Sequence, residues 1–428
     1  MGTLARIRRA LCIGAVAALL AGCGSSQLPI RAPSAMPQAS VLAVRASNTK
    51  YKIVYSFRGD QDAANPAASL IKAEGILYGT TASGGATGGR SCFGSPYCGT
   101  VFSITLKGRE KVLHSFGNGG DGVSSFAPLI DVNGVFYGTT SWGGSYGCGT
   151  SYYYYGCGTV FSVTPDGTEK VLHSFGNGSD GAEPSASLVD VNGTLYGTTQ
   201  AGGAHGAGTV FSITRSGTEN VVYTFSEPDG VSPSASLIEV NGKLYGTTQG
   251  GGAYSSGTVF SVTLSGSEKV LHSFGEGTDG AVPEAALINV AGTLYGTTKV
   301  GGRPKHCRRI CGTVFSITPS GRETVLHAFS GPDGGGPVAP LIEVNGELYG
   351  TTQGGGTYSS GTVFRITPSG SEKVLHSFNA DGDGEYPYAG LTDVNGTLYG
   401  TTYSGGNYGA GTVFSLTLES RAREAASR

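Results

Sequence analysis

The sequence predicts an all-β protein, a seven-bladed β-propeller of four-stranded blades. A phrase close to "VNGTLYGTT" (191–199) occurs seven times, and its tyrosines are separated by 59, 59, 49, 50, 54 and 50 residues. A period near 50 indicates a repeat architecture. Glycine makes up 74 of the 428 residues and charged residues make up 14%, as expected for β structure with many turns. The repeated tyrosines are Tyr78, Tyr137, Tyr196, Tyr245, Tyr295, Tyr349 and Tyr399.

Each unit contains four phrases in a fixed order, and each phrase is expected to form a strand of five to seven residues. Examples are 186–193, 194–199, 208–214 and 268–274, which we letter A to D from the inside of the ring. Val, Ile, Phe, Tyr and Thr dominate them, and these residues suit a pleated, packed surface. One such sheet cannot bury both of its faces, whereas seven sheets stacked around a ring can.

Strands A and B are expected to form a tight hairpin, because Asn-Gly stands between them in five units. Asn-Gly supplies the two positive φ angles of a type I′ turn. The pairs are 133–134, 192–193, 241–242, 345–346 and 395–396.

The ends of the repeat region indicate how the ring closes. The region spans 51–417, opens with a D-type phrase (51–57) and finishes with a C-type phrase (411–417). We therefore expect the N-terminal strand to complete the last blade as its strand D, which leaves no open seam.

The repeats resemble two known families. The stretch "SLIEVNGKLYGTTQGGG…GTVFSVT" is similar to the Kelch repeat in layout, although the Trp of the fourth Kelch strand is missing. The pattern "LYGTT..GG…GTVFSIT..G.E.VLHSF" more specifically resembles the bacterial Gloeo/Verruco (GloVer) tandem repeat, over residues 51 to 417. That resemblance implies a secreted or anchored repeat protein and brings no established activity.

The first 50 residues predict export. Three arginines precede an apolar run that is too short to span a membrane and that resembles a secretory signal over residues 1–22. "LAGC" (20–23) resembles a lipobox, so Cys23 is expected to be lipidated and to anchor the chain to the bacterial envelope, at the outer membrane or cell surface. A plain signal peptide is the alternative. Residues 23–50 are expected to form a flexible tether, and 418–428 a polar tail.

Six further cysteines all lie in the three expanded loops between strands B and C. Their grouping favours three local disulfides in an oxidising compartment. A zinc site through "HCRRIC" (306–311) is the rival interpretation. The expected pairs are Cys92 with Cys98, Cys148 with Cys157, and Cys307 with Cys311.

The B–C and D–A loops of a propeller share one face, and the B–C loop of unit 2 (141–157) is rich in aromatic residues. Flat amphipathic rings on this loop would stack on a sugar or anchor a protein partner. Alternatively, the loop covers its own blade and buries these rings. The candidate ligand-binding residues are Trp142, Tyr146, Tyr152, Tyr153, Tyr154 and Tyr155.

The B–C loop of unit 5 (303–311) is a second candidate, because it collects basic residues in a chain with few charges. It would meet an anionic glycan, a lipid headgroup or a carboxylate, or it is an ordinary solvated loop. The candidate residues are Arg303, Lys305, His306, Arg308 and Arg309.

Polar residues that recur in every unit predict structural roles. An aspartate in each D–A loop is expected to cap a turn, and a histidine or tyrosine in each strand D to pack and form a hydrogen bond. In five units a carboxylate stands at the end of strand A, and together these carboxylates form a ring. We favour a position on the solvent-exposed rim of the propeller. Alternatively, they face the central channel, where they would bind a cation. Its members are Asp131, Asp190, Glu239, Glu343 and Asp393.

The sequence contains no catalytic, phosphate-binding or metal-binding motif, so we expect no catalytic residue, cofactor or metal. A net charge of −2 provides no basic field for nucleic acid. The favoured interpretation is a monomeric, envelope-anchored module that binds carbohydrate or protein on the face with the long loops. The alternatives are a polysaccharide lyase or hydrolase that uses loop residues such as His205, Glu183 or Glu385, and a purely structural surface protein.

Overall fold

The computed structural model describes residues 49–86, 98–118, 120–148, 156–302, 311–379 and 382–418, all within one unit, Ser47–Arg428. These residues contain strands and turns but no helix. In particular, no helix among them has the length and hydropathy needed to cross a membrane.

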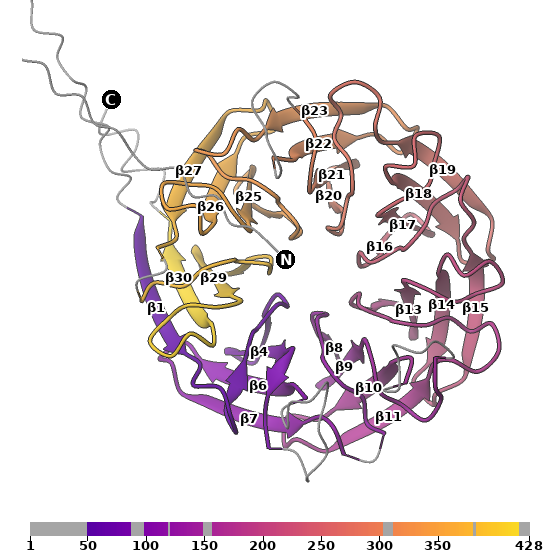
Figure 1. Cartoon of the computed structure of the whole chain (residues 1–428), viewed down its shortest axis with the longest axis horizontal. Helices are drawn as coiled ribbons and strands as arrows, with labels where there is room; N and C mark the ends of the chain where they lie inside the picture. The colour runs from indigo at the N-terminus through magenta and orange to yellow at the C-terminus, as the bar shows by residue number, and fades with distance from the viewer. Residues whose placement is uncertain are drawn as a thin grey trace, which may run out of the picture. The chain divides into compact units, whose positions relative to one another are not determined.

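Seven four-stranded antiparallel sheets form the blades of a ring (Figure 1). Strands follow in the order A, B, C, D. Blade 1 contains β3 (Ile71–Ala73), β4 (Ile76–Thr81), β6 (Thr100–Thr105) and β7 (Glu110–Ser115). Blade 2 contains β8 (Ile130–Val132), β9 (Val135–Thr140), β10 (Thr159–Val163) and β11 (Glu169–Ser174). Blade 3 contains β12 (Val189–Val191), β13 (Thr194–Thr199), β14 (Thr209–Thr214) and β15 (Glu219–Thr224).

The remaining blades repeat this pattern. Blade 4 contains β16 (Ile238–Val240), β17 (Lys243–Thr248), β18 (Thr258–Thr263) and β19 (Glu268–Ser273). Blade 5 contains β20 (Ile288–Val290), β21 (Thr293–Thr298), β22 (Thr313–Ile317) and β23 (Glu323–Ala328). Blade 6 contains β24 (Ile342–Val344), β25 (Glu347–Thr352), β26 (Thr362–Ile366) and β27 (Glu372–Ser377). Blade 7 contains β28 (Thr392–Val394), β29 (Thr397–Thr402), β30 (Thr412–Thr417) and β1 (Lys50–Ser56). The short strands β2 (Ala63–Ala64) and β5 (Ser83–Gly84) pair beside blade 1.

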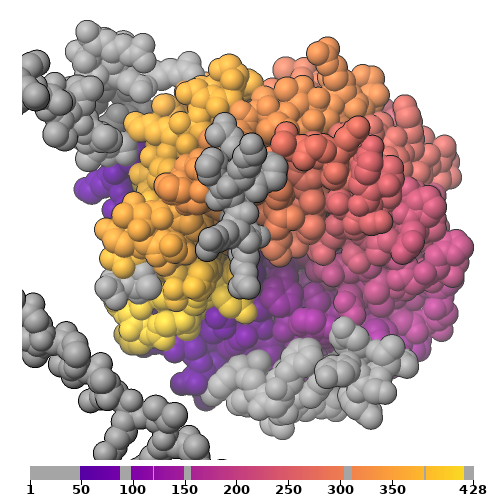
Figure 2. Space-filling model, turned by 45° about the horizontal axis from the view of Figure 1, so that its top comes forward, coloured from indigo at the N-terminus to yellow at the C-terminus, as the bar shows by residue number. Residues whose placement is uncertain are grey.

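The N-terminal strand closes the ring as predicted. β1 pairs antiparallel with β30, with Lys50 opposite Thr417 and Ser56 opposite Thr412. Figure 1 shows the indigo β1 along the yellow β30, and Figure 2 shows indigo and yellow atoms side by side at the surface. Every blade therefore has four strands.

The A–B hairpins also match the prediction. Asn192 and Gly193 have φ angles of 53° and 88°, as a type I′ turn requires. The A strands, however, have three residues and not the expected five to seven. The chain before them bonds to the preceding blade: the Thr139 hydroxyl donates to the Ala186 carbonyl at 3.0 Å.

The core lies between the blades, where each strand C contributes a fully buried phenylalanine. Phe211 of β14 packs edge to face on Phe175, with ring centroids 5.0 Å apart. The glycine of "LYGTT" makes room for it, because a Cβ on Gly197 would stand 2.6 Å from the Phe211 ring and 2.8 Å from Leu188.

Candidate functional site

A pocket of about 550 Å³ lies at the inner end of the blades, on the face that carries the D–A and B–C loops. We call it the axial pocket, because all seven blades contribute to its wall. Each blade contributes the residue just before the Ala that precedes strand A. These residues are Ala67, Phe126, Ser185, Ser234, Glu284, Val338 and Tyr388.

A second lining position is the residue that directly follows strand B. It lies 15 residues after the first position in every blade, and four of its seven members line the pocket: Ser141, Gln200, Gln249 and Tyr403. Trp142 and Glu183 are the other wall residues in the part of the chain that the structure describes. The strand residues around these positions repeat almost unchanged, whereas these two positions differ from blade to blade.

In two blades the residue at the second lining position donates a hydrogen bond to the residue at the first. In blade 3, the Gln200 amide donates to the Ser185 hydroxyl. In blade 4, Gln249 Nε2 donates to Ser234 Oγ at 2.8 Å. These contacts fix each amide in place and leave its carbonyl oxygen available as an acceptor.

An ion pair and two aromatic pairs occupy other parts of the wall. In blade 5, Lys299 Nζ lies 3.0 Å from Glu284 Oε1. The rings of Phe126 and Trp142 in blade 2 meet edge to face, with centroids 5.8 Å apart. Tyr388 and Tyr403 in blade 7 do the same at 5.3 Å. The pocket therefore has an aromatic side and a polar side.

Two titratable side chains of the wall are affected by their surroundings. Burial raises the pKa of the Glu183 carboxyl, because a low-dielectric environment disfavours the charged form. Burial also raises the pKa of Tyr388, with smaller contributions from Tyr403, Tyr386 and Glu284. In its protonated form such a carboxyl can donate as well as accept a hydrogen bond.

The structure brings only part of the sequence-predicted site together. Trp142 lines the axial pocket and also packs against the core of its blade. Tyr146, from the same loop, is 45% exposed and does not line the pocket. Outside the described residues lie Tyr152, Tyr153, Tyr154, Tyr155, Arg303, Lys305, His306, Arg308, Arg309 and Cys23.

One of the expected disulfides is fully described, between Cys148 and Cys157. It joins the middle of the B–C loop of blade 2 to the end of that loop. Cys98 and Cys311 are also disulfide-bonded, whereas Cys92 and Cys307 lie outside the described residues.

The sequence reasoning missed most of the pocket, including Phe126, Tyr388, Tyr403 and Glu284. An alignment of the seven copies on their tyrosines would have revealed the two variable positions, because they stand out from constant neighbours.

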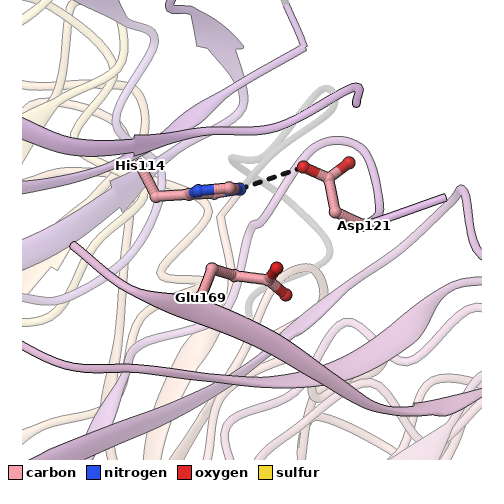
Figure 3. A group of neighbouring side chains, drawn as sticks. All are labelled: His114, Asp121 and Glu169. Carbon is pink, nitrogen blue, oxygen red and sulfur yellow. Dashed lines mark hydrogen bonds and ion pairs between the residues drawn. The ribbon is translucent and has the colours of Figure 1, made fainter. Parts of the chain in front are cut away.

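A second cluster of titratable groups lies between adjacent blades, near the outer edge. His114 Nε2 of β7 is 3.0 Å from Asp121 Oδ2 in the following loop, and Glu169 of β11 points toward them from the next blade (Figure 3). Asp121 Oδ1 also accepts the backbone N–H groups of Gly117 and Asn118. The predicted turn cap and histidine hydrogen bond are both confirmed.

The ligand atoms of His114, Asp121 and Glu169 lie within 4.8 Å of one another, as metal ligands would. The histidine and the aspartate already bond to each other, and the aspartate bonds to the loop. The same arrangement recurs around the ring, so we interpret it as part of blade packing.

The carboxylates at the ends of the A strands bond to the A–B turns or to a neighbouring arginine. Two of these carboxylates have partners in their own blade. Asp131 Oδ1 accepts the Gly134 N–H at 2.8 Å, and Asp190 forms an ion pair with Arg215 at 3.3 Å. Glu239, Glu343 and Asp393 accept turn N–H groups in the same way as Asp131.

The fold and its repeats define the class of this protein, a seven-bladed β-propeller built from tandem units of about 50 residues. The chain belongs to the Gloeobacter/Verrucomicrobia repeat family, whose model matches residues 94–310 and 304–426. This confirms the family resemblance. No curated protein matches the sequence.

The chain is similar to several solved structures at low sequence identity. The chain is similar to a puromycin hydrolase (11% identity, TM-score 0.49, 78% of this chain and 50% of the hydrolase covered). It is similar to a quinohemoprotein alcohol dehydrogenase from Pseudomonas putida (9%, 0.47, 86% and 76%) and to a luciferin-regenerating enzyme (11%, 0.40, 83% and 92%). Similarity at these identities and TM-scores does not indicate an activity for this chain.

Proposed function

We propose that this protein is a binding module that holds a carbohydrate ligand in the axial pocket. The observation that carries the proposal is the composition of the pocket wall, which combines two aromatic pairs with two hydrogen-bonded Gln–Ser pairs. Sugars present apolar C–H faces and hydroxyl edges, and such a wall offers a surface for each. A protein partner on the same face is the second class of ligand.

The proposed setting is the bacterial envelope, with the chain anchored through a lipid on Cys23. A tether between the lipid and the ring would let the pocket face reach polysaccharide at a distance from the membrane. Metabolic labelling with a fatty-acid analogue would test this part of the proposal. A labelled wild type and an unlabelled Cys23→Ala variant are expected, whereas an unlabelled wild type would refute the anchor.

The binding proposal is tested by titrating the full chain with a panel of polysaccharides and oligosaccharides by calorimetry. We expect Trp142→Ala to weaken binding by at least tenfold, about 1.4 kcal/mol, because it removes a wall aromatic. Tyr146→Ala is the matched control, since Tyr146 shares the loop but not the pocket, and its affinity should stay within twofold. If the folded wild type binds no glycan, the carbohydrate proposal is wrong and protein partners become the target.

A polysaccharide hydrolase is the second candidate, and Glu183 is the observation that favours it. Its carboxyl lines the pocket with a raised pKa, which suits a general acid. The same panel decides between the two: release of reducing ends that disappears in Glu183→Gln indicates an enzyme, and binding without product indicates a module.

A further inference from the structure

The aromatic side of the axial pocket has a gap at blade 1. Around the ring, β3 of blade 1 contacts β28 of blade 7 and β8 of blade 2. Blade 7 carries the Tyr388–Tyr403 pair, blade 2 carries the Phe126–Trp142 pair, and among the residues that the structure describes blade 1 contributes only Ala67. A small side chain therefore stands between two aromatic pairs, and we call this place the blade 1 notch.

Alanine at this position leaves space that a larger side chain would fill. The equivalent residues of the flanking blades are Phe126 and Tyr388, so the backbone at this position accepts an aromatic side chain. Ala67 itself is partly exposed to the pocket. The notch thus results from the choice of residue in blade 1 and not from a different backbone.

A flat ring in the notch would lie between the blade that carries the Tyr388–Tyr403 pair and the blade that carries the Phe126–Trp142 pair. A pyranose stacks on an aromatic ring through the face where its axial C–H bonds point, and an axial hydroxyl blocks that face. A ring held from two sides must therefore be free of axial hydroxyls on both faces. Glucose, xylose and N-acetylglucosamine meet this requirement in β-linked chains, whereas mannose and galactose each have one blocked face.

The polar side of the pocket fits the edge of such a ring. The Gln200 and Gln249 amides, each held by a serine of its own blade, lie two and three blades away from the notch. Equatorial hydroxyls radiate from the edge of the ring, where amide carbonyls can accept from them.

We propose that the blade 1 notch is a subsite for one pyranose ring with all of its hydroxyls equatorial, so that the ligand is a gluco- or xylo-configured saccharide. This inference rests on the proposed function, because it specifies the ligand class of the same pocket.

The chain contains a single tryptophan, Trp142, and it lines the pocket. The tryptophan fluorescence of the chain therefore comes from a residue of the pocket wall beside the proposed subsite. The probes are cellopentaose, xylopentaose, β-1,4-mannopentaose and β-1,4-galactotetraose, titrated into the full chain. Cellopentaose or xylopentaose is expected to change the Trp142 emission and to bind at least tenfold more tightly than the other two.

Ala67→Phe is the decisive variant, because it fills the notch and removes no wall residue. We expect it to weaken binding of the preferred probe more than tenfold while the thermal midpoint stays within a few degrees of wild type. If that variant unfolds, Ala67→Leu gives the same test with a smaller side chain. Tyr146→Ala remains the control with unchanged affinity.

The outcomes separate the two proposals. Tight binding of the manno- or galacto-configured probe, with loss in Trp142→Ala, leaves the pocket a carbohydrate site and refutes the inference about configuration. Unchanged affinity in Ala67→Phe refutes the notch. Binding detected by calorimetry without a change in Trp142 emission refutes the notch as the subsite. The absence of binding by all four probes refutes the inference about configuration, and the wider glycan panel then decides the proposed function.

Discussion

At the scale of the residue, each position of the repeated phrase "LYGTT" has a packing or hydrogen-bonding role in the structure. Its leucine and tyrosine are buried, its first threonine donates to the next blade and its second bonds to strand C, as Thr199 does to Thr209 at 2.9 Å. Its glycine is required because a side chain there would occupy the space of a buried phenylalanine. Each position therefore has a packing reason to recur, independent of any ligand.

Gly197→Ala is expected to destabilise the protein by about 1–3 kcal/mol, the usual cost of overpacking a core. The new Cβ would overlap with Phe211 and Leu188, at 2.6 and 2.8 Å. Gly147→Ala is the matched control, since a Cβ there meets nothing within 4 Å. Denaturant unfolding followed by circular dichroism would compare them, and equal midpoints would contradict the packing argument.

At the scale of the element, the outer strand of each blade carries the contacts that join it to the next. A glutamate begins strand D in six blades and approaches the His–Asp or Tyr–Asp pair of the preceding blade. Burial raises its pKa to about 7 in every case, as for Glu169, Glu219 and Glu372. One carboxylate oxygen of each of these glutamates is buried without a hydrogen-bond partner.

The interface between blades 6 and 7 is the exception. Tyr51 of β1 occupies the place of the glutamate, stacks on His376 with ring centroids 3.8 Å apart, and donates its hydroxyl to the Asp383 carbonyl at 2.9 Å. This interface is thus free of the glutamate carboxyl that the other six interfaces contain.

Stability is therefore expected to fall as pH rises from about 5 to 8. A group whose pKa is higher in the folded than in the unfolded state contributes stability below its unfolded pKa, here 4.5, and loses that contribution as pH passes its folded pKa, here about 7. Since the glutamates are partly exposed, solvent screening reduces each contribution. We expect the thermal midpoint to drop by more than about 5 °C in total.

The check is differential scanning calorimetry across this pH range on wild type and on a variant with all six glutamates changed to glutamine. The variant should lose most of the pH dependence, because glutamine does not titrate. Glu227→Gln, at an exposed position, should leave the profile unchanged. A wild-type midpoint that is flat or rises over this range would show that the interfaces do not hold protons as argued.

At the scale of the whole molecule, β1 decides whether the ring is closed. It is the outer strand of blade 7, and its backbone pairs with β30 along six residues. Without it, blade 7 would have three strands and an unpaired edge, which invites association between chains. Phe57, directly after β1, is fully buried between blades 7 and 1 and packs on Phe102 at 5.2 Å.

Deletion of residues 1–57 is therefore expected to lower the thermal midpoint by more than about 10 °C and to produce oligomers. Deletion of residues 1–48 is the control, because it leaves β1 intact and should give a monomer with the wild-type midpoint. Scanning fluorimetry and light scattering after size exclusion would measure both. A monomeric 1–57 deletion with the wild-type midpoint would show that closure by β1 is dispensable.

The sequence alone determined the number of blades, the A–B hairpins and the closure of the ring. These features depend on local turn preferences and on the number and order of the repeated phrases. Asn192 and Gly193 specify their turn through the backbone angles they tolerate, and the orphan phrases at 51–57 and 411–417 complete each other. It also assigned the repeated aspartates and histidines correctly, since a residue present in every blade serves what every blade needs.

Only the tertiary structure decided which side chains share the axial pocket. Phe126, Glu284 and Tyr388 are separated by 158 and 104 residues along the chain, and they meet because the ring brings the same position of each blade to one axis. No local pattern marks such a position, since a ligand site in a repeat protein consists of the residues that differ between copies. The repeats build the ring, and the tertiary structure shows where their differences converge.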